Sequence, residues 1–99
     1  MFIIMKKITI EELKRAIVHV DRGNSGIQNL GDVPDDAFLN LDLVRDLRMG
    51  NIRLTNVINE LHRYHGFDLP IDIFRKMPDD KVKTVMDTIN NYLKETGQG

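Results

Sequence analysis

The stretch that decides the fold is LVRDLRMGNIRLTNVINELHRYHGFDLP, residues 43–70. It predicts a short approach loop, a helix from Asn51 to about His65, and an exit that ends at Pro70. The inner face of this helix carries residues at helical spacing, namely Leu54, Val57, Ile58, Leu61 and then His65. The outer face carries Ile52, Asn56, Asn59 and Arg63, flanked by Arg53 and Glu60. Ile52 is thus an apolar residue that faces outward, close to Met49 in the loop, and the two are candidates for docking a partner.

The composition limits the chain to one small domain of a few function classes. Its 99 residues are 41% hydrophobic, which is enough for a single modest core. The formal net charge is -1, so the chain lacks the overall field that attracts nucleic acids or anionic membranes. The absence of cysteine excludes disulfides and cysteine-based zinc sites, and it agrees with a cytoplasmic location.

The two ends of the chain carry little pattern. Residues 1–5 form an apolar run far too short for a membrane span or a signal-peptide core. We expect residues 1–7 either to pack against the body or to be loose, and residues 96–99 to be a loose end. The whole chain, 1–99, is then one domain, and we expect a monomer.

Helical patterns account for the rest of the chain. Thr9 and Glu12 form a capping-box pattern at the start of a first helix, which ends near Arg22. A long connection follows, whose apolar residues should tuck under the helices, with a short helical turn over 38–44. A short helix fits residues 71–77, and a last helix begins around Asp79 or Thr84. The predicted fold is all-α: a small four-helix bundle with three longer helices, one short helix and a long first loop.

Catalytic and metal-binding patterns are weak. The aspartates of the first loop lack the ligand alternation and central glycine of an EF-hand. His62 and His65 lie three residues apart without a third ligand, and His65 is better placed to cap the helix end. Ser25 is the only serine, and no general base is placed beside it. We therefore expect neither an enzyme nor a metal site.

Three motifs resemble the acyl carrier protein family. Residues 46–52, DLRMGNI, lie where the family has Asp-Leu-Gly-hydrophobic-Asp-Ser-Leu, and residues 65–70, HGFDLP, resemble the Phe-Gly-Ile-x-Ile-Pro exit from its second helix. Lys83-Thr84-Val85, Asp87, Ile89 and Tyr92-Leu93 resemble its last helix. The similarity covers most of the chain, and the spacing from Asn51 to Pro70 needs no gap. The first loop is about eight residues longer than is usual in the family. It implies the acyl-carrier-protein-like bundle and a role in fatty acid or polyketide biosynthesis.

The departures from this resemblance concern the attachment site. The family attaches 4′-phosphopantetheine to a serine at the position of Asn51, whose amide is not a competent nucleophile. The preceding family aspartate is replaced by Gly50, and the family glycine by Arg48. We therefore expect no phosphopantetheine on Asn51. Asparagine caps a helix about as well as serine, so it could keep the structural role of that position.

The outer face of the helix predicted over residues 51–65 also differs from the family in charge. The family's second helix is acidic and meets basic partners, whereas Glu60 is the only acid here from Asn51 to His65. The first hypothesis is a module without a prosthetic group that docks on a partner protein, possibly an enzyme of acyl transfer or synthesis, through Met49, Ile52, Arg53, Asn56 and Arg63.

Two other hypotheses stay open. One is a working carrier of acyl or aminoacyl groups in a specialised pathway, attached at a non-standard site or aligned in another register. Ser25 is the first candidate for that attachment, while Thr55 is better explained by bonding to the helix backbone. The other is a small helical nucleic-acid-binding domain, against which the balanced charge argues.

Overall fold

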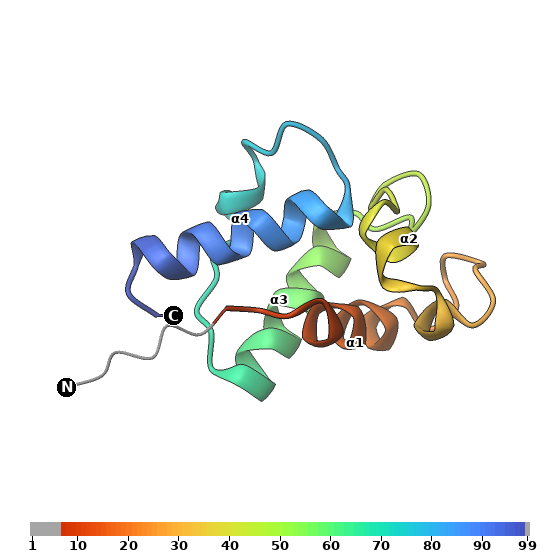
Figure 1. Cartoon of the computed structure of the whole chain (residues 1–99), viewed down its shortest axis with the longest axis horizontal. Coiled ribbons are helices and arrows are strands. Elements are labelled where there is room, and N and C mark those ends of the chain that lie inside the picture. The colour runs from red at the N-terminus through yellow and green to blue at the C-terminus, as the bar shows by residue number, and fades with distance from the viewer. Residues whose placement is uncertain (1–6, 99) are drawn as a thin grey trace.

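The computed structural model describes residues 7–98, and over that range the chain is helical without a β-strand (Figure 1). Its α-helices are α1 (Ile10–Asp21), α2 (Asp35–Leu39), α3 (Asn51–His65) and α4 (Val82–Glu95). Two short 3-10 turns, η1 (Leu30–Asp32) and η2 (Ile71–Phe74), lie in the connections. The all-α prediction is confirmed, and α3 has the predicted bounds. The prediction for residues 1–7 falls almost wholly on residues 1–6, which lie outside the described residues.

One hydrophobic core joins these elements. Helix α1 packs against α3, α2 packs against both α1 and α4, and η2 lies against α3 and α4. The largest fully buried side chains come from all four α-helices and from the connection before α3, namely Phe38, Leu13, Ile17, Leu47, Leu61, Ile89 and Leu93. As predicted, the long connection contributes buried residues to the core, including Phe38, Leu43 and Leu47, and Leu30 is buried as well.

Helix α1 begins and ends as the sequence indicates. The Thr9 hydroxyl accepts a hydrogen bond from the Glu12 N–H at 3.2 Å, and the Glu12 carboxylate accepts one from the Thr9 N–H at 3.0 Å. Both bonds of the capping box are therefore present. At the other end Arg22 adopts the left-handed conformation, with φ 47°, and closes the helix.

The loop before α3 is fastened to the start of α4. Asp42 and Lys81 form an isolated antiparallel bridge. The Leu43 N–H donates to the Asp80 carbonyl at 2.8 Å, and the Val82 N–H donates to the Leu41 carbonyl at 2.9 Å. These backbone bonds fix the place where the approach loop turns into α3.

Asp79 organises the start of α4. Its Oδ1 atom accepts hydrogen bonds from the Thr84 hydroxyl at 2.6 Å and from the Lys81 N–H at 2.9 Å. The helix itself starts at Val82, between the two starts that the sequence allows. The Thr84 hydroxyl, followed by the Lys81 N–H, lowers the pKa of the Asp79 carboxyl below its ordinary value.

We expect the Thr84→Val variant to raise the pKa of Asp79 toward its ordinary value. The variant loses the hydrogen bond from the Thr84 hydroxyl, which lowers this pKa more than the bond from the Lys81 N–H does. Since the folded-state pKa of Asp79 is depressed, its contribution to stability is present above the unfolded-state pKa and is lost as the pH falls through the folded-state pKa. The variant should therefore lose less stability than the natural protein on acidification through that window. Carboxyl-carbon NMR titration of Asp79 checks this. An unchanged titration would contradict the role given to Thr84.

The C-terminal end is held in place as far as residue 98. The Asp68 N–H donates to the Gln98 Oε1 atom at 2.7 Å, and the Gln98 Nε2 atom donates to the Asp68 carbonyl at 2.9 Å. The prediction of a loose end at residues 96–99 is thus wrong at Gln98, whose amide pairs with the Asp68 backbone after α3.

Among residues 7–98, no helix is both long and apolar enough to cross a membrane.

Candidate functional site

The start of α3 is open to solvent. Gly50 is the N-cap residue and supplies no side chain, while Asn51 is the exposed first residue of the helix. No side-chain hydrogen bond caps this end, and the first turn contains no acidic residue. The expectation that Asn51 caps the helix is wrong, because the helix begins one residue too early for its amide to reach the free N–H groups.

Met49 and Val44, two apolar residues near the start of α3, differ in burial from the sequence predictions. The sequence predicts Met49 on an exposed surface that binds a partner. That prediction is wrong, because Met49 is buried, with 4% exposure. Its N–H donates to the Leu43 carbonyl at 2.8 Å, which turns the side chain into the core. Val44, expected under the helices, is instead 57% exposed. Ile52 is 81% exposed, as its place on the outer face predicts.

A hollow of about 300 Å³ adjoins these residues, between the start of α3 and η2. Its lining is largely apolar and includes Val44, Ile52, Ile71, Phe74 and Met77, with Arg75 and Asp80 among the polar members. Arg75 is paired with Asp72 at 3.2 Å in an exposed ion pair. The hollow is large enough to receive an aliphatic side chain, and the sequence does not predict it because its lining comes from segments far apart in the chain.

The outer face of α3 forms a surface that we call the α3 ridge, consisting of Arg48, Ile52, Arg53, Asn56, Asn59 and Arg63. All of these residues are exposed except Arg53, which is half-buried. Residues 47–67 contain a single acid, Glu60, whose side chain is only 14% exposed and pairs with His19 of α1 at 3.1 Å. The ridge is therefore a mixed apolar and basic surface. Ile52, Arg53, Asn56 and Arg63 lie on it as predicted.

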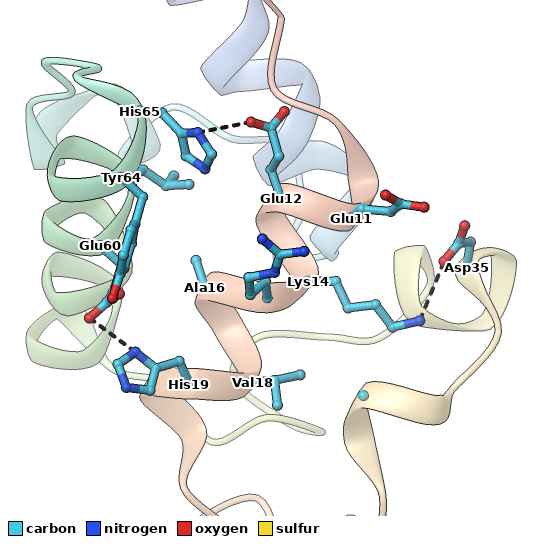
Figure 2. A pocket seen from close by; sticks show the side chains of 13 residues that line it. Glu11, Glu12, Lys14, Ala16, Val18, His19, Asp35, Glu60, Tyr64 and His65 are labelled. Carbon is cyan, nitrogen blue, oxygen red and sulfur yellow. Dashed lines mark hydrogen bonds and ion pairs between the residues drawn. The ribbon is translucent and has the colours of Figure 1, made fainter.

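A second and larger depression of about 880 Å³ lies between α1 and α3 (Figure 2). Two reciprocal pairs cross it: His19 of α1 meets Glu60 of α3, and His65 of α3 meets Glu12 of α1 at 3.0 Å. Each helix thus contributes one histidine and one glutamate. These contacts fasten the two helices together, and we assign the groove a structural role.

The histidines of α3 point to separate partners. His65 stacks on the Phe67 ring, with centroids 5.9 Å apart, and pairs with Glu12, so it does not cap the helix as expected. The cap is Gly66, with φ 73°. His62 is the residue near the exit, with its Nδ1 atom 3.3 Å from the Phe67 carbonyl. Residues 7–98 hold no group of three or more side chains suited to a metal ion.

The alternative attachment residues are engaged in the fold. Ser25 is buried, with 6% exposure, and its hydroxyl donates to Asp21 Oδ2 at 2.9 Å, while its N–H donates to Asp21 Oδ1 at 2.8 Å. The Thr55 hydroxyl donates to the Asn51 carbonyl at 2.8 Å, as predicted. Asn51 itself offers an exposed amide. The residues around α3 therefore do not suit the covalent attachment of phosphopantetheine.

The exposed apolar and basic groups at α3 suit non-covalent recognition. Comparisons with protein-family models, with curated proteins and with solved structures gave no match.

Proposed function

We propose that this protein is an acyl-carrier-like docking module that binds a partner protein through the α3 ridge and carries no prosthetic group. The observation that carries the proposal is Ile52, which exposes 81% of its surface on the first turn of a helix whose only acid is turned toward α1. The exposed isoleucine and the adjoining apolar hollow together offer a partner an apolar surface to bury.

Backbone conformation supports the resemblance to carrier proteins. Arg48 has φ 52°, in the left-handed region that favours glycine, and the family has glycine at that position. Gly66 has φ 73° at the end of α3, where the family's exit motif also has glycine. The loop into α3 and the exit from it thus have conformations that suit the family sequence even where this sequence departs from it.

The chemistry of the Asn51 side chain supports a role without covalent attachment. The family's serine hydroxyl attacks the pyrophosphate of coenzyme A, whereas the Asn51 amide lacks a nucleophilic lone pair of that kind. The alternative of a carrier modified at Ser25 requires a hydroxyl that a transferase can reach. The burial of Ser25 and its bond to Asp21 argue against that alternative.

The resemblance supports a partner in or near acyl-group metabolism, such as a protein that handles acyl transfer or synthesis. The reversed charge of the ridge distinguishes it from an ordinary fatty-acid carrier. A basic enzyme surface that fits an acidic helix would meet Arg53 and Arg63 instead. We expect such enzymes to be excluded from this face.

The test uses the full chain with a photo-crosslinking amino acid at position 52, expressed in its own cells. We expect one dominant crosslinked protein, which also co-purifies with the unmodified chain. In the Arg53→Glu and Arg63→Glu double variant this capture should fall at least about tenfold, because two favourable charges become repulsive.

The matched control is the Lys83→Glu and Lys94→Glu double variant on α4, which changes the net charge equally at two exposed residues. We expect it to capture the partner as well as the natural chain does. Both variants should keep their melting temperatures within a few degrees, since Arg63, Lys83 and Lys94 are exposed and Arg53, although half-buried, has no ion-pair partner within residues 7–98. Equal loss of capture in both variants, or no capture at position 52, would contradict the docking proposal.

A further inference from the structure

The charges of the α3 ridge are unbalanced. Residues 47–67 contain three arginines, Arg48, Arg53 and Arg63, and the single acid Glu60. The Glu60 carboxylate already faces His19, and within residues 7–98 none of the three arginines takes part in an ion pair. Their guanidinium groups are therefore free to bind carboxylates of another molecule, which arginine does with two parallel hydrogen bonds.

The spacing of these charges is that of a helix surface. Arg53 and Arg63 are ten residues apart on α3, and at 1.5 Å per residue they are separated by about 15 Å along the axis. Arg48 adds a further positive charge just before the helix. Between the charges lie Ile52, Asn56 and Asn59, which are one apolar and two neutral polar side chains. A binding partner must supply acids about three helical turns apart and an apolar group near one of them.

The hollow beside Ile52 defines that apolar group. Its lining by Val44, Phe74 and Met77 favours an aliphatic side chain over a charged one, and its volume of about 300 Å³ is enough to receive such a side chain. Asp80 also lines the hollow, so a carboxylate of the partner is disfavoured inside it. The site combines one apolar anchor with two separated positive charges.

On the basis of the proposed function, we propose that the partner segment is an acidic amphipathic helix whose aliphatic anchor enters the hollow beside Ile52. Its carboxylates bind Arg53, with Arg48, at one end and Arg63 at the other. Helix-in-groove recognition with a few anchors along one face is a common mode of peptide binding. The proposal names the partner by its charge, in contrast to the basic surfaces that acidic carrier helices meet.

The test measures binding of designed helical peptides of about 15 residues to the full, ¹⁵N-labelled chain by NMR. The acidic probe carries one leucine with glutamates about three turns apart on the same face, and its two matched controls carry glutamine or lysine in place of each glutamate. We expect the acidic probe to shift the amide signals of residues 44, 52, 53 and 63. Its affinity should fall roughly tenfold in the Arg53→Glu and Arg63→Glu variant and with added salt.

The Lys83→Glu and Lys94→Glu variant should bind the acidic probe as the natural chain does. If the glutamine or lysine probe binds as tightly at the same residues, the acidic partner is excluded while the docking function stands. If none of the peptides shifts these signals, the acidic helix is likewise excluded, and the crosslink at position 52 judges the docking function separately. Short duplex DNA that shifts the same signals where the acidic probe does not would also overturn the proposal.

Discussion

Replacing Phe38 by alanine is expected to lower the free energy of unfolding by about 3–5 kcal/mol. Its ring is fully buried on the short helix α2, at the place where this helix packs against both α1 and α4. The Lys14 ammonium lies 5.3 Å from the ring centroid and covers one side of it. Removing the ring leaves a cavity where three helices meet, and a helix of five residues has little local stability with which to compensate.

Urea unfolding followed by far-UV circular dichroism measures this effect. A small domain has about 5–15 kcal/mol of stability, so the Phe38→Ala variant should unfold at a much lower urea concentration. The control is Val44→Ala, at an apolar residue that is 57% exposed, and its effect should stay within about 0.5 kcal/mol. Similar losses in both variants would mean that the long connection is not packed as described.

Replacing Asp21 by alanine is expected to cost about 1–3 kcal/mol, the second largest effect. The carboxylate is buried at the end of α1 and accepts the N–H and the hydroxyl of Ser25, at 2.8 and 2.9 Å. Without it, both buried donors lose their partner. The Asp21→Asn variant keeps an acceptor oxygen and should lose less.

Thermal unfolding of the Asp21 variants beside Asp87→Ala tests this expectation. Asp87 is exposed on α4, so its removal should change the melting temperature little. If Asp21→Ala is no less stable than Asp87→Ala, the Asp21–Ser25 pair does not anchor the loop. The Ser25 hydroxyl would then be freer than its bonds indicate, and the case for a carrier modified at Ser25 would be stronger.

The regular parts of the fold follow from the sequence because helical spacing separates buried from exposed residues. The bounds of α3, its buried stripe and the exposure of Ile52 all result from the same 3.6-residue period. The capping box of α1 is equally local, since it involves residues three apart. Such features need no knowledge of the rest of the chain.

The loop before α3 has no such period, and there the predictions for Met49 and Val44 are wrong. Two hydrogen bonds within the loop accompany the burial of Met49 and the exposure of Val44: the Met49 N–H donates to the Leu43 carbonyl, and the Val44 N–H donates to the Asp42 carboxylate. The cap of α3 moves by one residue, from Asn51 to Gly50, which is within the ordinary uncertainty of helix ends.

The contacts between helices are also invisible in the sequence. The pairs His19–Glu60 and His65–Glu12 join residues 41 and 53 positions apart, and no spacing rule connects them. They nevertheless decide the character of the proposed site. Because Glu60 turns toward His19, the only acid of α3 is withdrawn from the ridge, which remains apolar and basic.

We propose that the start of α3 resembles the attachment site of a carrier protein but carries no prosthetic group. The most direct measurement is the intact mass of the purified chain before and after incubation with coenzyme A and a broad-specificity phosphopantetheinyl transferase. An acyl carrier protein with its own serine serves as the positive control in the same reaction. We expect the control to gain the group and this chain to keep its mass, because Asn51 lacks a hydroxyl and that of Ser25 is buried. A gain of one phosphopantetheine, mapped to Ser25 or to any other residue, would contradict the claim.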